Sequence, residues 1–148
     1  MSLPDSDAGD EIQRLADALR PALLKVSRRL RREAQKVGVS PLDAQLLGLI
    51  SKHPGLGAAE LADREQVSRP SMSVHLKRLA AEGLIRREAQ IGDGRRAGIR
   101  LTPAGEAALA AIRAHRNDWL AARLARLTPA SRRALAAAAA PLLRLAEA

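Results

Sequence analysis

Cysteine is absent from this chain of 148 residues, and aromatic residues make up 1% of it, with Trp119 as the single example. The absence of cysteine excludes disulfides, thiolate metal sites and thiol-based redox sensing. Because Phe and Tyr are also absent, Leu, Ala, Ile and Val must supply most of the hydrophobic core. This composition suits helices packed on helices better than a large sheet, so the sequence predicts a mainly helical protein.

Long apolar runs are also missing. No stretch approaches the roughly 20 apolar residues that a membrane span needs, and the beginning of the chain, MSLPDSDAGD, is polar and acidic. We therefore expect a cytoplasmic protein without a membrane partner. The hydrophobic content of 47% argues against general disorder, and the length fits one compact domain with flanking helices.

Positive charge, in contrast, is in excess: 25 Lys and Arg residues against 16 Asp and Glu give a formal net charge of +9. Such a balance favours a polyanionic partner, which can be nucleic acid, an anionic membrane surface or an acidic protein. Composition alone does not choose among these three. The choice depends on the order of the elements along the chain.

Hydrophobic periodicity and capping residues divide the chain into successive elements. Residues 1–9 have the composition of a disordered lead, and Asp10 is the expected N-cap of a first helix that ends near Gly38. Three later helices open with Ser or Thr followed by Pro, which is typical of an N-cap and a first helical residue. The predicted helices are 10–38, 41–52, 58–64, 68–82, 103–127 and 129–148, and the predicted strands are 84–89 and 98–102.

The order helix, short helix, tight turn, helix and basic hairpin is that of a winged helix-turn-helix, and it lies within residues 40–102. We therefore expect a mainly α fold with a small β-hairpin wing. Residues 10–38 and 103–148 are the expected dimerisation helices, because they carry more apolar surface than so small a winged domain can cover. A two-fold homodimer is the symmetric solution, and burial of this surface within one chain is the alternative.

The predicted helix at 68–82 has two unlike faces. A turn of about 100° per residue places Met72, Leu76 and Leu79 on a stripe that faces the core. The opposite face has short hydroxyl groups, an apolar side chain that can touch a thymine methyl, and cations. The candidate DNA-binding residues of this helix are Ser68, Arg69, Pro70, Ser71, Ser73, Val74, Lys77 and Arg78, with Arg69 favoured as the residue that reads a base. A solvated polar face without a DNA partner is the alternative interpretation.

The hairpin supplies a second group of candidate DNA-binding residues at its tip, Asp93, Gly94, Arg95 and Arg96. Asp followed by Gly indicates a tight turn, and an arginine on a hairpin suits the narrow, electronegative minor groove. Phosphates repel carboxylates, so an aspartate at the tip needs a positional role. We expect Asp93 to cap the turn or to pair with Arg95. Alternatively, Asp93 only forms the turn.

The stretch from Gly57 to Leu109 resembles the signature of the multiple antibiotic resistance regulator (MarR) family, from the helix-turn-helix through the wing. The resemblance includes an Asp-x-Arg at Asp93 and Arg95 and a Leu-Thr-x-x-Gly that ends at Gly105. The order of helices outside this stretch also matches, so the resemblance covers almost the whole chain.

This resemblance implies a transcription factor that binds a pseudo-palindromic operator in double-stranded DNA as a homodimer. The usual mechanism in the family is repression relieved by a small ligand, often phenolic or aromatic, bound between the dimer helices and the DNA-binding lobe. Two positions depart from the family pattern: Glu65, where an apolar residue is usual, and Gln66, where Gly is usual. These departures concern the geometry of the turn before the helix at 68–82.

A candidate effector site lies on the predicted helix at 103–127. Ile112, His115 and Trp119 fall on one stripe of this helix, and Trp119 is the only side chain of the sequence that could stack on an aromatic ligand. The alternative is that Trp119 anchors a dimer interface or the core and that His115 is a solvated neighbour.

Other functions fit the sequence less well. Ser, His and Asp are present, but His53 lies at a helix end and His75 on a helix flank, with no nucleophile elbow or Gly-rich phosphate loop. We therefore expect no enzyme, no catalytic residue and no cofactor. Three scattered histidines predict no metal site, although a site of His and carboxylates assembled across a dimer stays open. The strongest alternative is a basic winged-helix module that binds an acidic protein in place of DNA.

Overall fold

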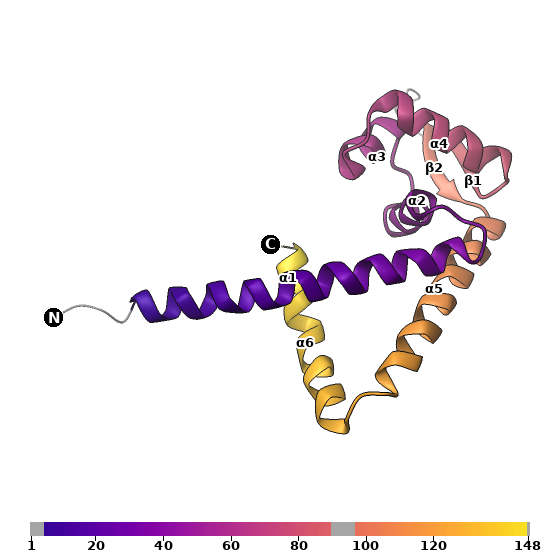
Figure 1. The fold of residues 1–148 in the computed structure, drawn as a ribbon. Helices are drawn as coiled ribbons and strands as arrows, with labels where there is room; N and C mark the ends of the chain where they lie inside the picture. Colours follow the sequence, from indigo (N-terminus) through magenta and orange to yellow (C-terminus); the bar gives the residue numbers. More distant parts are fainter. Residues whose placement is uncertain (1–4, 90–96, 148) are drawn as a thin grey trace.

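The computed structural model describes residues 5–89 and 97–147, which form a mainly helical fold with one small antiparallel hairpin (Figure 1). The predicted fold class is confirmed. The elements are α1 (Asp5–Gln35), α2 (Pro41–Lys52), α3 (Ala58–Glu65), α4 (Arg69–Ala81), β1 (Ile85–Ala89), β2 (Ala97–Leu101), α5 (Pro103–Leu124) and α6 (Pro129–Glu147). We call the described part of residues 41–101, which runs from α2 to β2, the winged lobe.

Four helices begin at the N-caps that the sequence predicts. The hydroxyl oxygens of Ser40, Ser68, Thr102 and Thr128 each accept a hydrogen bond from the backbone N–H three residues further on, at 3.1, 3.3, 3.1 and 3.2 Å. Each helix also has Pro in its first turn, where the missing N–H has no helical partner to lose. Such a cap stabilises a helix by about 1 kcal/mol, which fixes the starts of α2, α4, α5 and α6.

The first helix begins earlier than the sequence predicts. It starts at Asp5, so Asp10 is not its N-cap and residues 5–9 are helical where a disordered lead was expected. Asp7 and Asp10 lie in its first two turns, where negative charge interacts favourably with the helix dipole. At its other end α1 stops at Gln35, and Gly38 follows with φ +78°, in the left-handed conformation expected of a glycine at this stop.

The core lies almost entirely within the winged lobe. It is built from aliphatic residues and Met72, and Trp119 does not take part. The fully buried large side chains are Leu46, Leu47, Ile50, Leu61, Met72, Leu76, Leu79, Ile99 and Ile112. Ile112 comes from α5. Together with Ala34 of α1, it completes the core on the side of the terminal helices.

The junction between the wing and α5 explains the Leu-Thr-x-x-Gly motif. Thr102 donates its hydroxyl hydrogen to the carbonyl of Gly83 and accepts from the N–H of Gly105. A Cβ on Gly105 would lie 2.0 Å from the carbonyl oxygen of Leu84, so any other residue would push α5 away from the hairpin. Gly98 of β2 is confined in a similar way, because a Cβ there would lie 2.8 Å from the carbonyl oxygen of Gly55.

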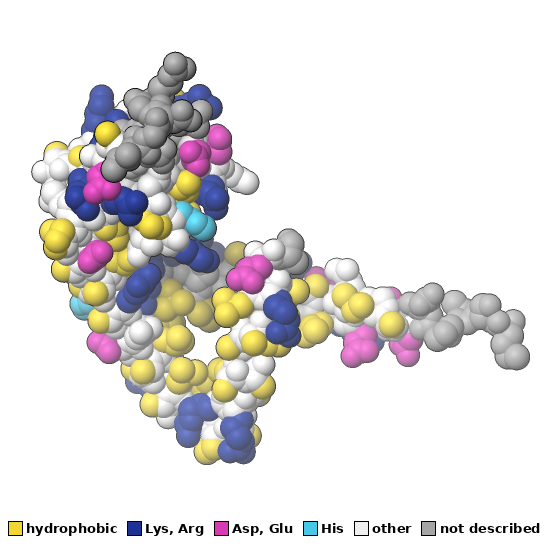
Figure 2. Space-filling model, turned by 180° about the vertical axis from the view of Figure 1, so that it is seen from behind, with side chains coloured by type: hydrophobic (Ala, Val, Ile, Leu, Met, Phe, Trp, Pro, Cys, Tyr) yellow, Lys and Arg dark blue, Asp and Glu magenta, His cyan; other side chains and the backbone are white. Residues whose placement is uncertain are grey.

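The terminal helices extend away from the lobe. In Figure 1, α5 and α6 form a V that points away from the winged lobe, and α1 crosses its open end. Figure 2 shows hydrophobic side chains along both arms of the V and Lys and Arg side chains at its apex. None of the described residues of α6 is buried, in contrast to the winged lobe. Within the described residues, no helix is long and apolar enough to span a membrane.

Candidate nucleic-acid interface

The turn between α3 and α4 keeps its geometry despite the departure at Gln66. Gln66 has φ 53° and ψ 41°, in the left-handed region where glycine is favoured, and its N–H reaches the carbonyls of Ala62 and Asp63. The N–H of Val67 also bonds to the carbonyl of Ala62, at 3.0 Å. This conformation costs a non-glycine residue roughly 1–2 kcal/mol. The turn nevertheless forms, and it leads directly to the N-cap of α4 at Ser68.

The two predicted faces of α4 differ in burial as expected. Met72, Leu76 and Leu79 are buried in the core. On the outer face Val74 is 64% exposed. Of the other candidates on this helix, the exposed ones are Ser68, Arg69, Pro70, Lys77 and Arg78, and the half-buried ones are Ser71 and Ser73.

The polar groups on this face are partly engaged already. The Ser68 oxygen is the N-cap acceptor, so its hydroxyl hydrogen is the group left to donate to a phosphate. Arg69 and Lys77 form no ion pair with any residue that the structure describes. These two cations are therefore available to a polyanion.

Arg78 differs from the other candidates, because its guanidinium forms an ion pair within the protein. Its Nη2 donates to Oδ2 of Asp43 on α2, and the same nitrogen lies 3.1 Å from Nδ1 of His75. Periodicity placed Arg78 on the outer face, but a long side chain can bend back to a buried carboxylate. In the structure Arg78 is thus an intramolecular partner of Asp43, which sequence reasoning did not single out.

The wing is held at its base by a charge cluster. Arg86 and Arg100 lie directly opposite each other in the hairpin, an arrangement that is destabilising for like charges. Glu88 offsets it: one carboxylate oxygen lies 2.8 Å from Nη2 of Arg86, and the other lies 2.7 Å from Nε of Arg100. The predicted tip residues Asp93, Gly94, Arg95 and Arg96 lie outside the described residues, so their DNA-binding role stays a prediction.

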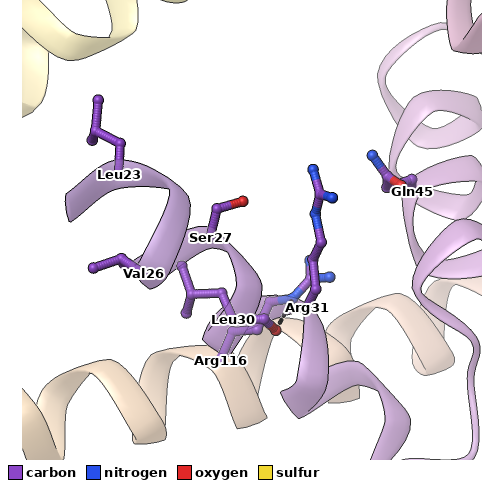
Figure 3. A pocket seen from close by; sticks show the side chains of 7 residues that line it. All are labelled: Leu23, Val26, Ser27, Leu30, Arg31, Gln45 and Arg116. Atoms are coloured by element: carbon purple, nitrogen blue, oxygen red, sulfur yellow. Dashed lines mark hydrogen bonds between the residues drawn. The ribbon is translucent and has the colours of Figure 1, made fainter. Parts of the chain in front are cut away.

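A cavity of about 400 Å³ opens between α1, α2 and α5 (Figure 3). It is lined by Leu23, Val26, Ser27, Leu30, Arg31, Gln45 and Arg116. Nε of Arg116 donates to the carbonyl of Leu30 at 3.2 Å. Burial, and secondarily the charge of Arg31, lower the pKa of Arg116, so two guanidinium groups here share a site that would gain from a bound anion.

The predicted effector residues do not meet at this cavity. Ile112 is fully buried in the core, because tertiary packing turns this part of the α5 stripe toward the winged lobe. His115 is exposed, and Trp119 is half-buried with the Arg123 guanidinium 5.2 Å from its ring centroid. None of the three lines the cavity, and within the described residues no cluster of three or more His, Asp or Glu could hold a metal ion.

Known proteins share this architecture. A family model described as MarR family matches residues 37–96. Over 143 residues, the chain is 34% identical to an uncharacterised HTH-type transcriptional regulator of Mycobacterium bovis, with 97% of this chain and 96% of that protein covered. A structure of a Mycobacterium tuberculosis MarR family protein in complex with salicylic acid is 30% identical, with a TM-score of 0.62 over 82% of this chain and 93% of that one. A Staphylococcus aureus MepR mutant bound to an oligodeoxyribonucleotide is 20% identical and shares the fold, with a TM-score of 0.66 over 88% of this chain and 96% of that one.

The helix-turn-helix, the wing and the outer face of α4 define a winged helix-turn-helix DNA-binding protein. The chain belongs to the MarR family of transcriptional regulators. Members of this family regulate transcription and are not enzymes, and this chain is accordingly a regulator and not an enzyme.

Proposed function

We propose that this protein binds a pseudo-palindromic operator as a homodimer, represses the genes beside it and is modulated by a small ligand. The observation that carries the proposal is the outer face of α4. Arg69, Val74 and Lys77 are all exposed, on a helix whose inner face is buried in the core. A protein with this task works where the chromosome is, which is the cytoplasm of a bacterium.

The proposed contacts divide into two groups. Ser68, Arg69, Pro70, Ser71, Ser73, Val74 and Lys77 enter the major groove with α4, and Asp93, Gly94, Arg95 and Arg96 bring the wing tip to the adjacent minor groove. Arg78 pairs with Asp43 in the free protein, so it joins the first group only when that ion pair opens. Val74 is suited to a thymine methyl, and Arg69 to the acceptors of a guanine.

The dimer is supported by the apolar surface of the terminal helices. Ile12 and Leu15 of α1 and Leu143 and Leu145 of α6 are all more than half exposed. A lone soluble chain rarely exposes so many large apolar side chains on its terminal helices, and a second copy related by a two-fold axis can cover both sets at once. The dimer would also set two α4 helices about one turn of DNA apart.

Charge supports the same partner. Asp7, Asp10 and Glu11 make the beginning of α1 acidic, whereas Arg132 and Arg133 make the beginning of α6 basic. The two segments belong to the part of the chain that the winged lobe leaves uncovered. A second copy can bring opposite charges together at the rim of the interface, which favours correct association over random aggregation.

The cavity between α1, α2 and α5 is the proposed ligand site. Its apolar side chains Leu23, Val26 and Leu30 and its two guanidinium groups, from Arg31 and Arg116, suit a small organic anion with an apolar body. Because the cavity joins the terminal helices to α2 of the winged lobe, a ligand there can change the distance between the two α4 helices of a dimer.

A mobility-shift titration tests the proposal, with the DNA upstream of the protein's own gene, a scrambled duplex and two salt concentrations. The wild-type protein should bind the upstream DNA selectively, and Arg69→Ala should lose about 1–3 kcal/mol of discrimination. Arg113→Ala removes an exposed cation of α5 and serves as the matched control. Equal, salt-labile binding to both duplexes would refute sequence-specific regulation and favour a basic winged module with a protein partner.

A further inference from the structure

Asp43 is a buried carboxylate that the helix cap does not use. Its side chain is 8% exposed, and it lies three residues after Ser40, where an acidic side chain often bonds back to the N-cap N–H. Here Oδ2 reaches instead to Arg78 on α4, while Oδ1 is buried without a hydrogen-bond partner among the described residues. A buried oxygen with no donor is uncommon and calls for an explanation.

The donor that can satisfy this oxygen is His75. Its Nδ1 lies 3.4 Å from Oδ1 of Asp43 and 3.1 Å from Nη2 of Arg78. Arginine can only donate, so a hydrogen bond from Arg78 needs Nδ1 as its acceptor, with the proton of the neutral ring on Nε2. In this arrangement, two acceptors, Nδ1 and Oδ1, face each other, which is why the carboxylate oxygen is left without a bond.

We propose that Asp43 is a positioning residue for Arg78 and that protonation of His75 releases Arg78 to the DNA backbone. A proton taken from solvent onto Nδ1 turns that nitrogen into a donor, and it then bonds to Oδ1 of Asp43. Arg78 then loses Nδ1 of His75 as an acceptor. It is repelled by the protonated imidazole and shares the Asp43 carboxylate with it. Its side chain is 43% exposed, so it can swing outward to a phosphate.

Other charged groups surround this cluster. Within the described residues, the ion pairs of His75 and Arg78 both go to Asp43 of α2. Helix α4 also packs against α3 and β1. The charged residues of these two elements are Glu60, Asp63, Arg64, Glu65, Arg86, Arg87 and Glu88, and those nearest to His75 on its own helix are Lys77 and Arg78. Of the β1 charges, Arg86 and Glu88 pair with each other.

The inference rests on DNA binding through α4 and adds proton linkage to it. DNA should favour the protonated cluster, so affinity should be several-fold higher at pH 6 than at pH 8. Because one more phosphate contact forms at pH 6, the plot of log affinity against log salt should steepen there by about 0.9. A cluster with a purely structural role would change protein stability without changing this slope.

The experiment measures DNA affinity over a salt series at pH 6 and pH 8, with folding of each variant checked by circular dichroism. His75→Gln should abolish the pH dependence of the slope. His53→Gln and His115→Gln are matched controls, because they remove the other two histidines of the chain, and both should keep it. A slope that is equal at both pH values in the wild-type protein, or that still changes in His75→Gln, would overturn the proposal.

Two further variants separate release of Arg78 from a general effect of charge on His75. Asp43→Asn keeps the size of the side chain and removes the charge that holds Arg78, so the steep slope should appear at both pH values. Arg78→Gln should give the shallow slope at both. If Asp43→Asn does not fold, Arg78→Gln decides, and a pH-dependent slope in that variant would contradict the proposed release.

A nitrogen NMR spectrum of the free protein tests the cluster without DNA. At pH 8 the His75 ring should have its proton on Nε2, and the Arg78 guanidinium signals should shift together with the His75 titration. A neutral ring with its proton on Nδ1, or Arg78 signals that do not change when His75 is protonated, would refute the release of Arg78. Absence of DNA binding in every sample would instead refute the proposed function, so the two failures are distinguishable.

Discussion

Leu76 of the winged lobe is fully buried, whereas Leu15 of α1 and Leu143 of α6 are more than half exposed. The same aliphatic chemistry thus completes a core in one region and leaves an uncovered surface in the other. The lobe is stabilised by contacts within one chain, while the terminal helices expose apolar area that only association can remove from water. The comparison predicts that substitutions in the lobe change folding and that substitutions in the terminal helices change assembly.

The largest effect should come from the junction between the wing and α5. Gly105→Ala places a Cβ against the carbonyl of Leu84, a backbone atom that cannot move aside cheaply, and should destabilise folding by more than about 4 kcal/mol. Gly48→Ala is the control, because nothing lies within 4 Å of its Cβ, and it should stabilise α2 slightly. Urea unfolding measures both, and a mild effect of Gly105→Ala would contradict the tight junction.

Truncation of a buried leucine comes next. Leu76→Ala removes methyl groups from the core beneath α4 and should lower the free energy of unfolding by about 2–5 kcal/mol. Its counterpart in the terminal helices, Leu143→Ala, should leave the unfolding of the winged lobe almost unchanged. Thermal unfolding at several protein concentrations compares them, and an equal loss in the two variants would remove the distinction between the regions.

A charge in the uncovered surface should break assembly and spare the lobe. Leu143 is 63% exposed, so Leu143→Glu costs the single chain little, yet it places a carboxylate in the proposed interface. Size-exclusion chromatography with light scattering should then report monomers where the wild-type protein gives dimers. Arg144→Glu, one residue further on, is the control for added negative charge. A Leu143→Glu protein that remains dimeric would place the interface elsewhere.

The smallest effect should come from the turn before α4. Gln66 is the one described non-glycine residue with positive φ, and Gln66→Gly relieves that conformation. The variant should gain up to about 1 kcal/mol, part of which the greater freedom of glycine in the unfolded chain takes back. Ser68→Ala, two residues further on, should instead lose about 1 kcal/mol with the cap. Denaturation curves that show no gain for Gln66→Gly would indicate a relaxed turn.

The starts of helices and their inward faces could be predicted from the sequence, because both depend on residues close together in the chain. Ser40, Ser68 and Thr102 cap their helices by accepting a hydrogen bond from the N–H three residues further on. Met72 and Leu76 follow the helical period. The start of α1 was the exception. Acidic residues favour both a polar lead and a helix N-terminus, so their presence before Asp10 did not discriminate between the two.

The site could be predicted only where local pattern decides it. Arg78 pairs with a carboxylate 35 residues away, and nothing in the period of α4 indicates that partner. Ile112 and Trp119 share a stripe, but the packing of α5 on the winged lobe buries the first and leaves the second beside Arg123. The cavity that includes Arg116 depends on three helices meeting, which only the folded chain reveals.

Protein-to-DNA stoichiometry, measured by sedimentation equilibrium on a duplex with the protein's selected site, tests dimeric DNA binding most directly. The wild-type protein should bind each site as two protomers. Leu143→Glu, whose winged lobe is intact but whose terminal helices cannot pair, should lose much of its affinity. One protomer bound with full affinity, or a Leu143→Glu protein that binds as tightly as the wild type, would contradict dimeric binding.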